Sequence, residues 1–264
     1  MTDSGRGSPA NPAARFSETE QRVYAAVASR DGMKAREIAA LLGIPRPEIS
    51  RLLFSSALMR EMCYQDRDYC WHALIRQSAP HEGLYEFSGW YGSVGEFLRQ
   101  DEAEWLARLE EGCGRIGRSL NDTRGLIHSF LDCRNTMAGL FRDLRDMMPA
   151  PFEDWELAFE LRLNRARYIR IYTDVLLIAG DKAFSLEFKM KRRVDPQELL
   201  QAAKYVPYLE IVLGRRIDVI PALVLTGTQE LFDFVPLEGT DSVIPVCSGN
   251  MLFNVLNEYM GFLG

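Results

Sequence analysis

The sequence has little of what several common protein classes require. Its five cysteines form no C-x-x-C pair and its three histidines have no short metal-ligand spacing, which argues against zinc fingers, zinc ribbons and disulfide scaffolds. A Walker A motif is also absent, so ATP-driven unwinding would need a separate helicase or ATPase subunit as a partner. Apolar runs are too short to span a bilayer, and no apolar signal segment is visible, so we expect a cytoplasmic protein without membrane contact.

The composition is that of a globular protein, but the charge is unevenly distributed. Of the 264 residues, 47% are hydrophobic and 26% are charged, which suits one large domain or two modest ones. The net charge of −6 argues against a uniformly basic surface. Residues 160–216 nevertheless carry twelve Lys and Arg against seven Asp and Glu, whereas residues 217–264 carry six acids and no Lys or Arg. This segregation could create one positively charged face that binds phosphates. Alternatively, these charged side chains only contact solvent.

Residues 17–80 have the pattern of a small helical module, after a tail of residues 1–16 that we expect to be flexible. Ser17 and Glu20 form a capping-box pattern that opens an amphipathic helix, and Gly43 suits a left-handed helix cap. Apolar spacing predicts three helices and then two short strands, over residues 18–31, 35–42, 46–57, 59–64 and 69–74.

This order of elements, with the sequence A-R-E-I-A-A-L-L-G-I-P-R-P-E-I-S-R-L-L, resembles a winged helix-turn-helix. The resemblance implies that the third helix lies in the DNA major groove and that Arg46, Ser50 and Arg51 face the DNA. Many winged helices mediate only protein contacts, which is the alternative for this one.

The remainder of the chain divides at a proline-rich segment near residue 150. Apolar residues recur at helical spacing through residues 81–150, which predicts a helical connecting region. Beyond it the pattern is mixed α/β. Strands are predicted at residues 168–178, 183–190, 216–225, 232–236 and 243–246, and helices at 195–213 and 250–262.

Three residues of this α/β region carry candidate chemistry. Asp174 interrupts the apolar strand I-Y-T-D-V-L-L-I, where a buried carboxylate needs a cationic partner. Glu187 and Lys189 are two residues apart in S-L-E-F-K-M and therefore project to the same side of a strand. A hairpin would bring Asp174 to Glu187, and Mg²⁺ or Mn²⁺ would stabilise that pair. Alternatively, Asp174 begins a turn, and Glu187 and Lys189 form a solvent-facing pair.

The D-x12-E-x-K spacing in apolar strands resembles the PD-(D/E)XK nuclease superfamily, whose fold is restriction-endonuclease-like. Gln201 and Tyr205 match the Q-x-x-x-Y motif of its RecB-like members, although taken alone they are typical of a helix surface. Thr173 stands where the superfamily's name has proline, a position that varies widely. The resemblance also implies an upstream acid, for which Glu160 is the first choice and Glu156 the second.

The resemblance implies a site that cleaves phosphodiester bonds. Asp174, Glu187 and the backbone carbonyl of Phe188 would hold Mg²⁺ or Mn²⁺. The other catalytic candidates, which would act on water or phosphate, are Lys189, Gln201, Tyr205 and Glu160. The candidates that would grip the DNA backbone are Lys191, Arg192 and Arg193, for which an ordinary solvated turn is an equal alternative.

We therefore predict an α/β (α+β) protein with a restriction-endonuclease-like mixed sheet flanked by helices. Its segments would be a tail (1–16), a winged helix-turn-helix (17–80), a helical connection (81–150) and a nuclease-like domain (151–264). The predicted function is that of a metal-dependent DNA nuclease in prokaryotic defence or DNA processing. Such a protein could act as a homodimer. The alternatives are a DNA-binding transcriptional regulator and an interaction subunit with an inactive nuclease-like domain.

Overall fold

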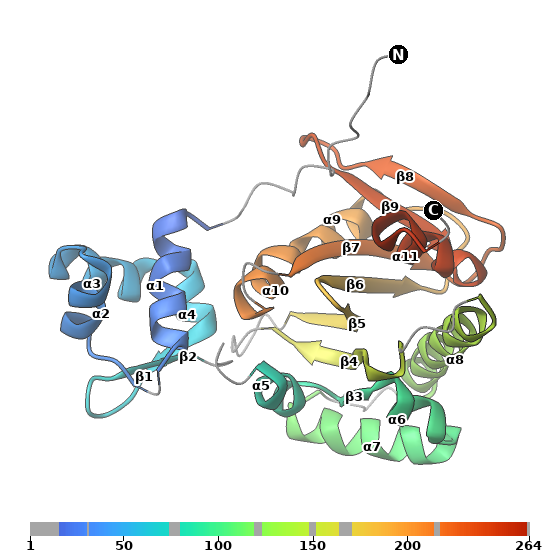
Figure 1. Cartoon of the computed structure of the whole chain (residues 1–264), viewed down its shortest axis with the longest axis horizontal. Coiled ribbons are helices and arrows are strands. Elements are labelled where there is room, and N and C mark those ends of the chain that lie inside the picture. Colours follow the sequence, from blue (N-terminus) through green and yellow to red (C-terminus); the bar gives the residue numbers. More distant parts are fainter. Residues whose placement is uncertain are drawn as a thin grey trace.

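The computed structural model describes residues 16–30, 32–73, 80–118, 123–147, 152–163, 171–213 and 217–262. The chain is mixed α/β, with a helical N-terminal part followed by a seven-stranded sheet and its helices (Figure 1). Most of the tail predicted as flexible, residues 1–15, lies outside the described residues. Phe16, assigned to that tail, is instead 3% exposed and part of the core.

The N-terminal part is a winged helix-turn-helix. Its elements are α1 (Glu18–Ala28), α2 (Ala35–Leu42), α3 (Arg46–Ser55), α4 (Ala57–Met62), β1 (Cys63–Gln65) and β2 (Trp71–Ala73). The capping box of Ser17 and Glu20 is present, and Gly43 adopts φ 66° after α2, as predicted. The strand predicted at residues 59–64 is wrong. α4 occupies most of it because Leu58, Met59 and Met62 are all buried, a spacing that fits one helix face.

The second part is built on one mixed sheet with the order β3-β4-β5-β6-β7-β9-β8. Its strands are β3 (Trp90–Ser93), β4 (Glu156–Arg162), β5 (Tyr172–Ala179), β6 (Lys182–Lys189), β7 (Asp218–Leu225), β8 (Phe232–Pro236) and β9 (Val243–Ser248). Strands β3 to β6 pair antiparallel, whereas β7 is parallel to both β6 and β9. The C-terminal ends of β6, β7 and β9 therefore lie at the same edge of the sheet.

Residues 81–150 are not the purely helical connection that the sequence predicts. They contain α5 (Pro80–Phe87), α6 (Val94–Arg99), α7 (Glu102–Arg115) and α8 (Thr123–Met147), but also β3. Trp90 of β3 pairs with Phe159 of β4 and is 1% exposed, so this segment forms the edge of the main sheet. β3 has only four residues, and its alternation of buried and half-buried positions is too short to be distinguished in the sequence from the helical spacing on either side. The sequence therefore predicts helix throughout this segment.

Helices cover both faces of the sheet. On one face, Leu176 and Ala183 share a core with α10 (Val206–Leu213), and Leu223 packs with α9 (Pro196–Lys204). On the other face, Val175 and Phe184 share a core with α7, α8 and α11 (Leu252–Met260). The single helix predicted at 195–213 is divided at Tyr205 into α9 and α10. No described helix, α8 with its 25 residues included, has the length and hydropathy needed to cross a bilayer.

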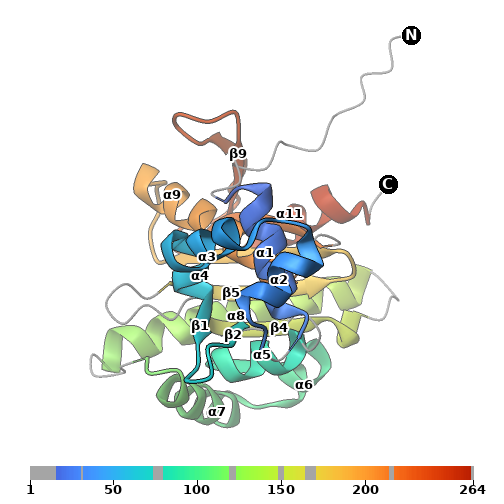
Figure 2. The ribbon, with the colours of Figure 1, turned by 90° about the vertical axis from the view of Figure 1, so that its left-hand side faces the viewer.

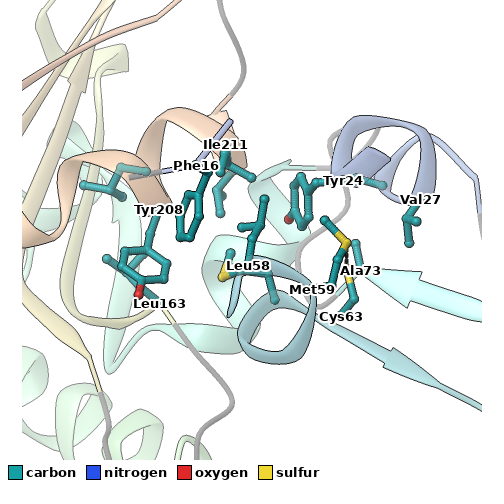
Figure 3. Packing of buried hydrophobic residues seen from close by; sticks show 14 of the residues in the cluster. Phe16, Tyr24, Val27, Leu58, Met59, Cys63, Ala73, Leu163, Tyr208 and Ile211 are labelled. Atoms are coloured by element: carbon teal, nitrogen blue, oxygen red, sulfur yellow. Dashed lines mark hydrogen bonds between the residues drawn. The ribbon is translucent and has the colours of Figure 1, made fainter. Parts of the chain in front are cut away.

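The two parts share a hydrophobic core at α10. The ring of Phe16 meets the ring of Tyr208 edge-on, with 5.6 Å between centroids. Leu58 of α4 packs into the same cluster, together with Leu163 at the end of β4 (Figure 3). Viewed from the helix-turn-helix side, α1 to α4 lie directly in front of the sheet (Figure 2). The N-terminal module is therefore docked on the α/β part by buried apolar contacts.

Candidate functional site

The predicted acids lie on three neighbouring strands. Phe159 pairs with Val175 and Leu161 with Thr173, so the register places Glu160 of β4 opposite Asp174 of β5. Between β5 and β6, the last paired residues at this end are Val175 and Leu186. Beyond them, the backbone N–H of Phe188 donates a 2.8 Å hydrogen bond to the Asp174 carboxylate. The side chain of Asp174 thus ties β5 to β6 where the ladder ends.

Glu187 and Lys189 complete the centre of the cluster. The Lys189 ammonium donates a 2.6 Å hydrogen bond to one carboxylate oxygen of Glu187, which is 1% exposed. The other oxygen, Oε2, is buried without a hydrogen-bond partner. One acceptor atom of Glu187 is therefore buried without a hydrogen-bond donor of its own.

Helix α9 brings the two remaining predicted residues to this cluster. The amide of Gln201 donates a 2.8 Å hydrogen bond to the hydroxyl of Tyr205, and that hydroxyl lies against the Glu187 carboxylate. The amide and the hydroxyl meet because residues four apart share one face of a helix. Six predicted catalytic candidates, Glu160, Asp174, Glu187, Lys189, Gln201 and Tyr205, are therefore neighbours in space.

Glu160, and not Glu156, is the acid next to Asp174. Glu156 pairs with Ile178 four residues along the strand, and it accepts a hydrogen bond from the Tyr91 hydroxyl. Glu160 has φ 53°, in the left-handed region that non-glycine residues rarely adopt. Such strain persists where the surrounding structure holds it, and it occurs often at functional sites.

Arg118 is a member of the site that the sequence did not predict. It follows α7, and its Nε lies 2.9 Å from a carboxylate oxygen of Glu160. Its guanidinium also lies over the ring of Tyr172, 4.6 Å from the centroid. Glu160 and Arg118 are 42 positions apart in a chain rich in arginine, so no local sequence signal could have revealed this pairing.

Burial raises the pKa of all three acids, and repulsion by Asp174 adds to the rise for two of them. Burial, followed by the charge of Asp174, raises the pKa of Glu160 and of Glu187 to about 8. Burial also raises the pKa of Asp174 above its ordinary value. Burial alone would lower the pKa of Lys189, but Glu187 and Asp174 outweigh it and raise that pKa. Without a cation, the cluster therefore holds protons that ordinary carboxylates have lost at neutral pH.

The donor set fits a hard divalent cation held by two carboxylates. Among the described residues, no three His, Cys, Asp or Glu side chains form a group that could hold a metal ion. Mg²⁺ commonly uses only one or two carboxylates, with water and substrate phosphate as its other ligands. Asp174 and Glu187 supply two carboxylates, and the unpartnered Oε2 of Glu187 is a suitable ligand atom.

The residues predicted to contact DNA differ in their exposure and in their hydrogen bonds. Arg46 and Arg51 of α3 are exposed and Ser50 is half-buried. Arg192 and Arg193 are exposed beyond β6. Lys191 is not simply a solvated cation, because it donates a 2.6 Å hydrogen bond to the buried carboxylate of Glu198. This bond fixes the start of α9 against the end of β6.

Comparison with known proteins bears on the N-terminal part. Residues 14–58 match the family model described as "Sugar-specific transcriptional regulator TrmB", a segment that includes α1, α2 and α3. No curated protein matches the chain, and no nuclease family is identified. The chain therefore carries a TrmB-type helix-turn-helix followed by a mixed α/β domain.

Proposed function

We propose that the protein binds DNA through α3 and hydrolyses phosphodiester bonds at the cluster around Glu187, with Mg²⁺ or Mn²⁺ as cofactor. The TrmB-type helix-turn-helix supports the DNA-binding half of this proposal. The observation that carries the catalytic half is the buried, unpartnered Oε2 of Glu187, beside Lys189 and one strand from Asp174. A buried acceptor without a partner costs roughly 1–3 kcal/mol, which is easier to understand if a ligand uses it.

The strand order supports the restriction-endonuclease-like assignment. Asp174 lies on β5, Glu187 and Lys189 lie on the antiparallel neighbour β6, and α9 then leads to β7, which is parallel to β6. The resemblance in sequence implies this combination: an acid, an E-x-K strand, a helix with Q-x-x-x-Y, and a further strand. Because one fold can have many functions, the proposed activity depends on the residues around Glu187 and not on the strand order alone.

Each side chain has a role that its position allows. Asp174, Glu187 and the Phe188 carbonyl would hold the cation, which would polarise the scissile phosphate and lower the pKa of a water bound to it. Lys189 would donate a hydrogen bond to the attacking water or to the phosphate oxygen that gains charge. Gln201 holds the Tyr205 hydroxyl at Glu187 and so acts as a positioning residue. Arg118 offsets the charge of Glu160 and keeps it beside Asp174.

The test is cleavage of supercoiled plasmid, linear duplex and single-stranded DNA in Mn²⁺. We expect the wild type to cut at least one of these, and we expect Lys189→Ala to lose most of that activity. Lys204→Ala on α9, an exposed lysine without a partner among the described residues, is the control that removes the same charge. Absence of cleavage by the wild type, or full activity of Lys189→Ala, would contradict the nuclease proposal.

A second candidate function is a DNA-binding transcriptional regulator whose α/β domain does not cut DNA. The observation that favours it is the match of residues 14–58 to a family of transcriptional regulators. Such proteins usually bind two-fold symmetric sites as dimers. Sedimentation of the free protein and footprinting on genomic fragments would test it. A dimer that protects palindromic sites without Mn²⁺-dependent cleavage would favour the regulator over the nuclease.

A further inference from the structure

A polar groove lies at the edge of the sheet where β7 and β9 end. It has a volume of about 360 Å³, which is within the range of small-ligand sites. One wall is a single face of α8, and the other is formed by the segments that follow β7 and β9. The lining residues are Asp132, Asn135, Thr136, Asp143, Gln229 and Asn250, with Thr226, Thr228, Leu140 and two glycines between them. We call this feature the strand-end groove.

The strand-end groove adjoins the cluster around Glu187 through Thr226. The backbone N–H of Thr226 donates a 3.0 Å hydrogen bond to the carbonyl of Lys189, and its hydroxyl donates to the carboxylate of Asp132. Cys133, the residue after Asp132, is buried, and the nearby charge of Asp174 helps to raise its pKa. The groove on the α8 side and the cluster on the α9 side thus meet at one edge of the sheet.

The chemistry of the groove suits a base rather than a phosphate. Its lining contains two aspartates and no lysine or arginine, so it disfavours an anion. The side chains of Asn135, Asp143 and Gln229 have no hydrogen-bond partner among the described residues, whereas Asn250 is held by Glu230 and Ser248. Carboxylates accept hydrogen bonds from the amino group of cytosine, and amides pair with adenine. Thymine has no exocyclic amino group to offer.

We propose that the strand-end groove binds an unpaired, amino-bearing base of single-stranded DNA next to the scissile phosphate. This inference rests on the proposed nuclease function, since the cluster defines which phosphate is meant. The phosphates would remain outside the groove, on the side of Lys189 and Arg192. The site therefore discriminates against thymine and against bases that stay paired in a duplex.

The test compares fluorescent dC12 and dT12 by anisotropy without divalent cations, so that binding is measured without cleavage. We expect the wild type to bind dC12 about tenfold more tightly, which corresponds to 1.4 kcal/mol. Asp143→Ala should reduce this ratio to about two or less, and Asn135→Ala should reduce it as well. Asp146→Ala is the matched control, because Asp146 is an exposed aspartate of α8 outside the groove. It removes the same charge and should leave the ratio unchanged.

The outcomes separate this inference from the nuclease proposal. Equal affinity of the wild type for dC12 and dT12, or equal effects of Asp143→Ala and Asp146→Ala, would overturn the base-binding groove even if the protein cuts DNA. A preference for dC12 that Asp143→Ala abolishes would support the groove even if no cleavage is found. Displacement of dC12 by the same nucleotide concentration of free dCMP would overturn the assignment to a DNA strand.

Discussion

The hydroxyl of Tyr208 on α10 donates a hydrogen bond to the carboxylate of Glu61 on α4, across 147 positions of the chain. α4 directly follows α3, the helix proposed to contact DNA, and Tyr208 lies three residues after Tyr205. The helix-turn-helix and the cluster around Glu187 are therefore connected through one short stretch of α9 and α10. The bond is a polar contact beside the buried apolar contacts of this junction.

Loss of this bond should weaken the docking of the two parts. Tyr208→Phe keeps the ring against Phe16 but leaves Glu61 without this donor. We expect a loss of about 1 kcal/mol, or about 2–4 °C in melting temperature. Tyr69→Phe is the control, because Tyr69, between β1 and β2, is 73% exposed. An unchanged melting temperature for Tyr208→Phe would show that the bond does not stabilise the junction.

Replacement of Glu187 by Gln should separate metal binding from folding. Because the pKa of Glu187 is raised to about 8, the acid is largely protonated at neutral pH without a cation, and Gln resembles that form. The melting temperature of the metal-free protein should stay level or rise, while the stabilisation by Mn²⁺ and the cleavage should disappear.

The control for this substitution is Glu198→Gln. Glu198 is also a buried carboxylate with a lysine 2.6 Å away, but it is not among the proposed metal ligands. It should retain the increase in melting temperature with Mn²⁺. If metal-free Glu187→Gln melts well below the wild type, Glu187 is a structural partner of Lys189 and the nuclease proposal loses its main support.

The metal-free protein should become less stable as the pH rises from 5 to 9. The pKa of Glu160 and of Glu187 is 4.5 when the side chain is exposed and about 8 in the fold. Between these two pH values the native state therefore binds more protons than the unfolded state. Their contribution to the free energy of unfolding is present below pH 4.5 and is lost as the pH passes 8. Denaturant titrations at several pH values should show a shallower decline for Glu187→Gln. Parallel curves would contradict the raised pKa of Glu187.

Gln201→Ala should slow cleavage more than it weakens DNA binding. Gln201 holds the Tyr205 hydroxyl, and through it the Glu187 carboxylate. Its loss should therefore disturb the alignment of the reacting groups rather than the binding of DNA. We expect kcat to fall about tenfold with little change in KM, as measured by single-turnover and steady-state cleavage. Gln197→Ala, one turn earlier on the same helix, should behave as the wild type. Equal losses in kcat and in DNA affinity would assign Gln201 to substrate binding.

The double substitution Arg46→Ala and Arg51→Ala should weaken binding to duplex DNA. Both arginines are exposed on α3, and each phosphate contact that is lost should lower the slope of log affinity against log salt by about one. Arg99→Ala, an exposed arginine of α6, is the control. Equal affinity of the double variant and the wild type at low salt would remove α3 from DNA binding.

Most local elements, and most residues of the candidate site, could be predicted from the amino-acid sequence. Capping and apolar spacing located α1, α2 and α3, and the alternation in β5 and β6 located Asp174, Glu187 and Lys189. These predictions succeeded because helices and strands impose their own periods on neighbouring residues. The same reasoning failed at α4, at β3 and at the break at Tyr205, where burial against distant residues decides the conformation.

Contacts between residues far apart in the chain follow from strand pairing and helix packing, and no local pattern predicts them. Glu160 rather than Glu156 faces Asp174 because of the register between β4 and β5, and Arg118 reaches Glu160 from the end of α7. Thr226 joins the cluster to the strand-end groove because β7 lies parallel to β6. Such contacts depend on strand pairing and helix packing. A local pattern records which face a side chain is on, but not which partner the fold brings to it.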